Sequence, residues 1–220
     1  FAGKAGLSTA VVEEGLRVAR PMDPELHGAK DDLFKPNVTR KVLKKIKKKR
    51  VRWLHGAPSC KSFSRARRPN AALRSRQHPH GLPNRKWHPL VTHGNKAANL
   101  MFKLITAQHR AGGYWSIEHP RDSFMWLTVA GKKAARLPGA RRVVGDQCVF
   151  GAASVKPTAW LTNAPFFDAL EKKCPGPTEH PRHEPLVGML KGPDGKWVSR
   201  TSLAAAYPRG LCKALAQEVR

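Results

Sequence analysis

Cys60 is the residue of this sequence with the clearest chemical potential, and it lies in the segment GAPSCKSFSRAR, residues 56–67. Lys and Arg side chains follow the cysteine closely. Neighbouring cations lower the pKa of a thiol and so increase the fraction of nucleophilic thiolate. The segment therefore predicts a nucleophile, with a buried structural cysteine as the simpler alternative.

Glu118 is a second candidate, in the segment YWSIEHP, residues 114–120. A carboxylate at the end of a strand could exchange a proton or a hydrogen bond with a base held opposite to it. The alternative is a salt bridge to one of the many basic residues nearby.

The first residues, FAGKAG, predict a glycine turn between a strand and a helix, where a cofactor could approach the backbone. Asp23 follows about 20 residues later, at the distance where an acid accepts hydrogen bonds from ribose hydroxyls. Asp23 could equally be the turn residue before Pro24.

Taken in this order, the segments resemble the cytosine-C5 methyltransferase family over nearly the whole chain. FAGKAG resembles the S-adenosylmethionine loop, and the resemblance implies cofactor contacts by Phe1, Gly3, Gly6, Asp23 and Asp32. GAPSCKSFS resembles the Pro-Cys motif of the family, and IEHP resembles its Glu-Asn-Val motif. GDQCVFGAASVKPTAWLTN is similar to the segment carrying the family's arginine motif, and SLAAAYPRGLCKALAQEV to its closing helix.

The resemblance implies a Rossmann-like methyltransferase fold and a defined chemistry. The Cys60 thiolate would add to C6 of cytosine, Glu118 would hydrogen-bond N3, and C5 would take the methyl group of S-adenosylmethionine. The target base would have to leave its stack to reach such a pocket.

The sequence departs from the family at several positions. Ala5 replaces a glycine of the cofactor loop, Ser59 replaces a proline, and His119 replaces the asparagine of the glutamate motif. Lys156 stands near the expected arginine, and lysine cannot make the same bidentate contacts. About 40 residues separate Asn163 from the closing segment, which leaves little room for a target-recognition domain.

Four cysteines are spread widely without a CxxC pair, which favours a reducing compartment over a disulfide framework. In CPGPTEHPRH, the side chains of Cys174, His180 and His183 could supply three zinc ligands, with a fourth from elsewhere. A solvent-exposed basic loop is the favoured interpretation, so no metal site is predicted.

Alternating apolar patterns predict an α/β fold with a mainly parallel sheet flanked by helices, in a single domain over residues 1–220. Helices are expected after the glycine turn and at residues 39–50, 95–111 and 203–219, the last interrupted by Pro208 and Gly210. Strands are expected at 17–22, 51–54, 114–117, from 143 and at 159–161. Residues 65–93 predict a long basic loop, and residues 172–196 a surface excursion rich in Pro, Gly and His.

Charge points to a polyanionic partner. The formal net charge is +26, and residues 33–117 contain 21 Lys and Arg but no Asp or Glu. Solvated surfaces normally mix both signs, so this stretch predicts a nucleic-acid-binding surface. The expected phosphate contacts are Arg40, Lys41, Lys44, Lys45, Lys47, Lys48, Lys49, Arg50, Arg52, Arg65, Arg67, Arg68, Arg74, Arg76, Arg85 and Lys86.

Two functions fit these observations. The favoured one is an RNA-binding structural subunit of a ribonucleoprotein, such as an organellar ribosome, on a repurposed methyltransferase scaffold. The alternative is an active methyltransferase on DNA or RNA that uses S-adenosylmethionine. A basic DNA-packaging protein is a third and weaker hypothesis.

No apolar run approaches the roughly 18 residues that span a bilayer, so no membrane partner is expected. The start at Phe1 fits either a removed organellar presequence or a trimmed boundary; a mitochondrion or another organelle is favoured, and a nucleus is an alternative.

Overall fold

The computed structural model describes residues 5–65, 69–180, 182–192 and 195–220. The chain divides into two compact units. The first unit comprises Phe1–Ala2, Met22–Val143 and Ala159–Pro165, and the second comprises Gly3–Pro21, Val144–Thr158 and Phe166–Arg220.

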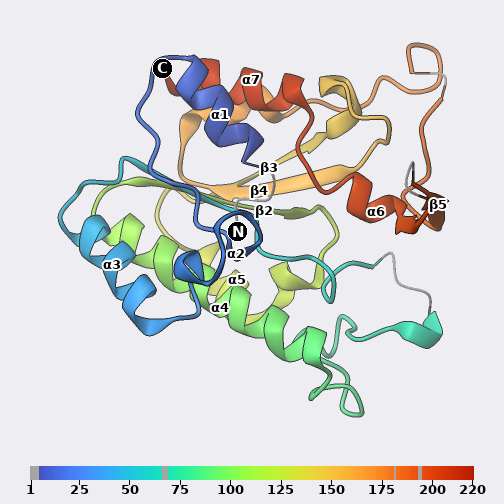
Figure 1. The fold of residues 1–220 in the computed structure, drawn as a ribbon, viewed down its shortest axis with the longest axis horizontal. Coiled ribbons are helices and arrows are strands. Elements are labelled where there is room, and N and C mark those ends of the chain that lie inside the picture. Colours follow the sequence, from blue (N-terminus) through green and yellow to red (C-terminus); the bar gives the residue numbers. More distant parts are fainter. Residues whose placement is uncertain (1–4, 66–68, 181, 193–194) are drawn as a thin grey trace. The chain divides into compact units, whose positions relative to one another are not determined.

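The main sheet is four-stranded, with strand order β1-β2-β4-β3 (Figure 1). These strands are β1 (Trp53–Gly56), β2 (Tyr114–Pro120), β3 (Arg141–Asp146) and β4 (Pro157–Thr162). β1 and β2 pair in parallel, with Trp53 opposite Tyr114 and Gly56 opposite Ile117. The predicted α/β class is confirmed, and the sheet as a whole is mixed.

Two long helices of the first unit lie side by side, α3 (Pro36–Lys47) and α4 (Pro89–Arg110). α3 buries Val38, Thr39 and Ile46 and exposes its basic side chains. α4 is apolar along one face, which packs with β2 in a core that includes Met101, Phe102, Ile105, Trp115 and Ile117. The unit is completed by α2 (Pro24–His27), α5 (Val129–Ala134) and the 3-10 turns η1 (Ala29–Asp31), η2 (Pro69–Ala71) and η3 (Phe124–Leu127).

α4 begins six residues earlier than predicted, so the basic loop ends before it. Pro89 occupies the first turn, where a missing N–H costs nothing, and Nδ1 of His88 accepts a hydrogen bond from the Leu90 amide at 3.2 Å. The strand predicted at residues 17–22 is not formed. Val18 in this segment is 37% exposed, and Pro21 lacks the backbone N–H that a sheet hydrogen bond would need.

In the second unit, α1 (Gly6–Glu13) packs against α7 (Arg209–Val219). Ala5 precedes α1 with φ +57°, a left-handed conformation that suits glycine better than alanine. The closing helix is interrupted at Pro208 as predicted, because this proline stands at the start of α7, but Gly210 lies within α7 and does not interrupt it. The short helix α6 (Arg200–Leu203) lies before most of the predicted range.

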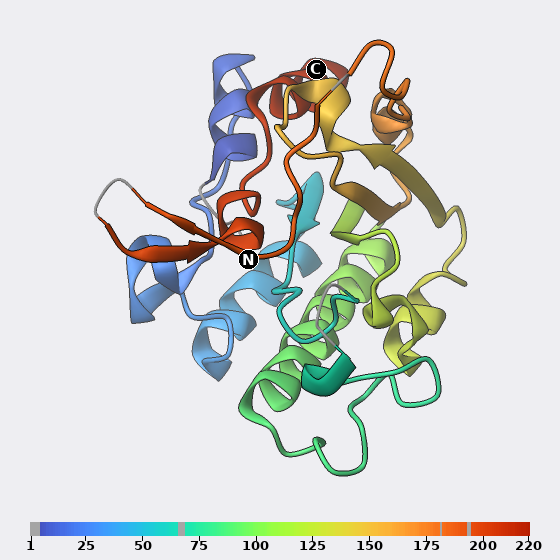
Figure 2. The same cartoon turned by 90° about the vertical axis from the view of Figure 1, so that its right-hand side faces the viewer.

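The remaining elements of this unit surround the predicted surface excursion. They are the 3-10 turns η4 (Gln147–Phe150) and η5 (Pro165–Leu170) and an antiparallel pair of strands, β5 (Met189–Lys191) and β6 (Trp197–Ser199). β6 leads directly into α6 (Figure 2). The excursion at residues 172–196 therefore contains a strand.

Candidate functional site

Cys60 follows β1, and Glu118 lies near the carboxyl end of β2, the strand that pairs with β1 in the first unit. The last residue of β1, Gly56, pairs with Ile117 of β2. Cys60 lies four residues beyond Gly56, and Glu118 comes directly after Ile117. The carboxyl ends of parallel strands are where α/β proteins commonly bind ligands. The structure therefore brings the predicted nucleophile segment and the predicted acid segment to the same end of a strand pair.

The cysteine itself is held on a tight turn. The carbonyl of Cys60 accepts hydrogen bonds from the amides of Phe63 and Ser64, both at 2.9 Å. The carbonyl of Phe63 accepts a hydrogen bond from the Phe124 amide at 3.1 Å, and the Phe63 ring is fully buried. Cys60 is exposed. It is not the buried structural cysteine of the simpler interpretation.

His119, which stands beside Glu118, is part of the core. Its ring makes edge-to-face contacts with Phe63 at 5.7 Å and with Trp126 at 6.0 Å between ring centres. Burial lowers the pKa of His119 to about 3, against a smaller raising effect of the Ser59 and Pro58 backbone. The Ser59 and Pro58 backbone lies near the ring, but neither ring nitrogen makes a hydrogen bond of normal geometry to a described residue. His119 is therefore neutral and connects the two motifs by packing.

Arg74 differs from the other predicted phosphate contacts because it is only 3% exposed. Its guanidinium donates to the carbonyls of Ser62, Pro79 and Val91, to Oγ of Ser62 and to Oδ1 of Asn95, at 2.6–3.1 Å. Burial lowers the pKa of Arg74 to about 10, so the side chain stays charged near neutral pH.

The prediction that Arg74 contacts nucleic acid is therefore wrong. Its donors are used inside the protein, where they join the basic loop to the turn after Cys60 and to α4. Gly94 permits this approach: a Cβ there would lie 2.5 Å from Oγ of Ser62 and 3.0 Å from Nη2 of Arg74. The described part of the basic loop around Arg74 is accordingly held by the protein's own contacts.

The predicted cofactor residues are only partly brought together. Phe1 and Gly3 lie outside the described residues, and Gly6 belongs to the second unit. Asp23 and Asp32 belong to the first unit with Cys60 and Glu118.

Both aspartates lie in locally hydrogen-bonded turns. The Asp23 carbonyl accepts hydrogen bonds from the amides of Leu26 and His27, and Oδ1 of Asp32 accepts one from the Phe34 amide at 2.8 Å. Oδ1 of Asp32 thus stabilises its own turn.

A small hollow lies beside the Cys60 turn. Its volume is about 110 Å³, below the roughly 300–1,000 Å³ of typical small-molecule sites. It is lined by Ser62, Ser64, Arg65, Ala72, Leu73, Arg74 and Phe124. Neither Cys60 nor Glu118 contributes to its wall.

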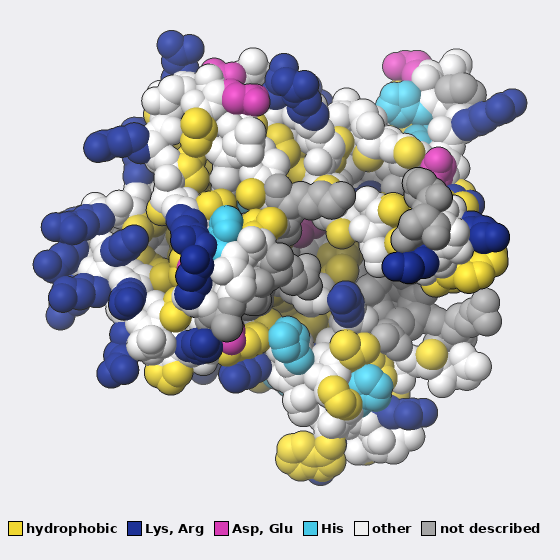
Figure 3. Space-filling view, in the orientation of Figure 1, with side chains coloured by type: hydrophobic (Ala, Val, Ile, Leu, Met, Phe, Trp, Pro, Cys, Tyr) yellow, Lys and Arg dark blue, Asp and Glu magenta, His cyan; other side chains and the backbone are white. Residues whose placement is uncertain are grey.

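The basic side chains of α3 and the turn after it form the largest group of predicted phosphate contacts. All are exposed: Arg40, Lys41, Lys44, Lys45, Lys47, Lys48, Lys49 and Arg50, followed by Arg52. Among the described residues, no acidic side chain forms an ion pair with the lysines of α3. Figure 3 shows Lys and Arg side chains gathered over this part of the first unit. Lysines in the last turn of α3 also interact favourably with the negative end of the helix dipole, and they therefore stabilise the helix itself.

The basic loop adds Arg65, Arg76, Arg85 and Lys86, which are all exposed, whereas Arg67 and Arg68 lie outside the described residues. Sequence reasoning missed Trp87, which is 79% exposed and has Nζ of Lys86 5.3 Å from its ring centre. An exposed aromatic ring among cations is typical of surfaces that stack nucleobases. The run NRKWH carried this signal.

The described side chains that could hold a metal ion are Cys148, Cys174, His180 and His183, and neither Cys60 nor Glu118 is among them. No helix of the described residues is both long and apolar enough to cross a membrane. Comparison with protein families, with curated proteins and with solved structures gave no match.

Proposed function

We propose that this protein binds RNA as a structural subunit of a ribonucleoprotein, such as an organellar ribosome, on a Rossmann-like scaffold repurposed from a cytosine-C5 methyltransferase. One observation carries the proposal: the exposed cations of α3 and the basic loop lie in a stretch, residues 33–117, that contains no Asp or Glu. A surface with so many cations and no acids of its own attracts an anionic partner.

The size of the electrostatic effect favours a permanent subunit. Each phosphate contact releases counterions, and 6–10 contacts change the affinity by about 10³ to 10⁵ between low and physiological salt. The exposed cations of α3 and the basic loop could make more contacts than this. A complex of that kind dissociates slowly, which suits an assembled particle better than an enzyme that must release its product.

Trp87 supports a partner with unpaired bases. Stacking on an exposed aromatic ring is worth about 1–3 kcal/mol per base and needs no particular base identity. Trp87 lies in the basic loop beside Lys86, so base stacking and phosphate contacts would act on the same RNA strand. Single-stranded or looped RNA offers both.

An active methyltransferase is the second candidate, because Cys60 is exposed and Glu118 lies near the carboxyl end of the adjacent strand. Three features count against it. His119 is buried where the family has an asparagine, the hollow beside the Cys60 turn is small, and the buried guanidinium of Arg74 forms part of its wall.

The first proposal is tested by measuring the affinity of the purified protein for single-stranded RNA over a range of salt concentrations. We expect little dependence on base sequence and a steep linear fall of log K with log salt. A shallow slope, or affinity confined to one RNA sequence, would contradict it.

The enzyme is tested separately. Calorimetric titration with S-adenosylmethionine is expected to show no binding, and micromolar binding would favour the enzyme. If methyl transfer were found, Cys60→Ser should abolish both the transfer and covalent trapping by a fluorinated cytosine.

A further inference from the structure

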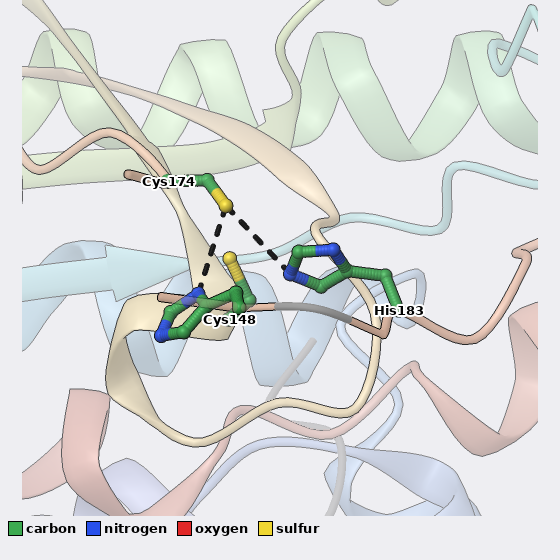
Figure 4. A group of neighbouring side chains, drawn as sticks. Cys148, Cys174 and His183 are labelled. Atoms are coloured by element: carbon green, nitrogen blue, oxygen red, sulfur yellow. Dashed lines mark hydrogen bonds between the residues drawn. The ribbon is translucent and has the colours of Figure 1, made fainter. Parts of the chain in front are cut away.

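Four side chains with metal-binding atoms converge in the second unit. They are Cys148 of η4 and Cys174, His180 and His183 of the following excursion, and their ligand atoms all lie within 4.8 Å of one another. Sγ of Cys174 is 3.6 Å from Nδ1 of His180 and 3.7 Å from Nε2 of His183. Figure 4 shows Cys148, Cys174 and His183 pointing toward a common centre.

The two distances from Sγ of Cys174 match tetrahedral zinc. With Zn–S near 2.3 Å and Zn–N near 2.0–2.1 Å, a tetrahedron places sulfur and nitrogen about 3.6 Å apart and two sulfurs about 3.8 Å apart. The observed sulfur–nitrogen distances agree with the first value. An ion could therefore enter with little movement of Cys174 and the histidines.

The backbone holds both ends of the segment that carries three of the ligands. The Asp146 amide donates to the Lys172 carbonyl at 2.8 Å, and Oδ2 of Asp146 accepts from the Cys174 amide at 2.9 Å. At the other end, the Glu184 amide donates to the Ala153 carbonyl at 2.8 Å. Residues 172–184 are thus fastened on either side of η4, which presents Cys148 at 7% exposure.

The turn that carries Cys148 is itself fixed. The Gln147 amide donates to the Val155 carbonyl at 2.8 Å, and Nε2 of Gln147 donates to Oγ1 of Thr158 at 3.0 Å. The carbonyl of Cys148 accepts from the Gly151 amide at 2.9 Å. These hydrogen bonds hold Cys148, the fourth ligand, in place before an ion binds.

The chemistry of the ligands selects the ion. Thiolate and imidazole favour zinc over magnesium or calcium, which prefer oxygen. Four protein ligands leave no open position, which is typical of a structural rather than a catalytic zinc site. Between Lys172 and Glu184 the described residues bury no large apolar side chain, so hydrophobic packing gives this segment little support.

We propose that Cys148, Cys174, His180 and His183 bind one structural Zn²⁺, which fastens residues 172–184 to η4. None of the four ligands is among the residues expected to bind RNA, cofactor or target base.

The first measurement uses the full chain under reducing conditions. Metal analysis is expected to find one zinc per chain. After chelation, titration with Co²⁺ should produce the visible bands of tetrahedral cobalt and a thiolate-to-cobalt charge-transfer band, which added Zn²⁺ removes. Substoichiometric zinc together with octahedral cobalt spectra would overturn the proposal, as would a Cys148–Cys174 disulfide that persists in reductant.

Variants locate the ion. Cys148→Ser and His183→Gln should each lose the stoichiometric zinc, while the matched changes Cys60→Ser and His78→Gln should retain it. Equal zinc content in all four would overturn the assignment.

Limited proteolysis provides a readout in the unmodified chain. It therefore tests the zinc site even if a variant fails to fold. Chelation should expose Lys173 and Arg182 to trypsin, and zinc should restore protection. Cleavage at these sites that does not respond to zinc would contradict a fastening role.

Discussion

The guanidinium carbon of Arg74 lies 3.7 Å from the ring centre of Phe63, the residue whose amide donates to the Cys60 carbonyl. This stacked pair joins the basic loop to the core beneath the Cys60 turn. A cation over an aromatic ring gains about 2 kcal/mol or more when it is desolvated. The guanidinium also donates hydrogen bonds to Ser62 and Asn95.

We expect Arg74→Lys to lower the free energy of unfolding by about 2–4 kcal/mol, because an ammonium cannot satisfy the same fork of acceptors and leaves some of them buried without a donor. Denaturant unfolding measures the loss. The matched control is Arg76→Lys, an exposed position where the change should stay within about 0.5 kcal/mol. Equal effects at the two positions would show that burial of Arg74 is not important for stability.

Neutralising the α3 lysines should weaken RNA binding and flatten its salt dependence. Replacing Lys44, Lys45, Lys47 and Lys48 by Gln should reduce the slope of log K against log salt by up to about 3 for a single strand. As a control, the same charge is removed from exposed residues of the second unit, by changing Lys173, Lys191, Arg209 and Lys213 to Gln. If both sets reduced the slope alike, binding would depend on net charge and not on α3.

Trp87→Ala should lower the affinity for single-stranded RNA by about 5- to 150-fold, the equivalent of one lost stacking contact, without changing the salt slope. Trp197 is 67% exposed in the second unit, so Trp197→Ala is a matched control that should leave the affinity unchanged. Fluorescence quenching of Trp87 by poly-uridine would provide a direct readout. An unchanged affinity for Trp87→Ala would remove this residue from the interface.

His119 should make the protein sensitive to acid. Its pKa is lowered from 6.5 to about 3 by burial, so the unfolded chain takes up a proton well before the folded protein does. The contribution of the neutral His119 ring to the free energy of unfolding is therefore fully present above pH 6.5. It is lost as the pH falls toward 3, at up to about 1.4 kcal/mol per pH unit. His55, whose pKa burial lowers to about 4, adds a contribution of the same sign.

The measurement is the free energy of unfolding as a function of pH for the parent protein and for His119→Gln. The variant should show a shallower slope between pH 4 and 6, whatever its stability at neutral pH. Changing the exposed His78 to Gln should leave the slope as it is. Parallel curves for the parent and His119→Gln would contradict a neutral, buried imidazole.

The helices and strands of the first unit were largely predictable from local patterns. The spacing of Leu100, Leu104 and Ile105 predicts α4, and the run at residues 114–117 predicts β2. The early start of α4 was missed because His88 and Pro89 cap it from within a segment whose composition is that of a loop. The absent strand at residues 17–22 was predicted although Pro21 disfavours it, and a strand forms only where a partner strand and a buried face exist.

The sequence by itself determined the charge of residues 33–117 and the presence of Cys60 and Glu118 in their motifs, because composition and order do not depend on folding. Only the tertiary structure decided that Arg74 faces inward while the α3 lysines face outward, since burial depends on what packs against each side chain. It alone brought Cys148 to Cys174, His180 and His183, because contacts between residues far apart in the chain follow from its path and not from local spacing.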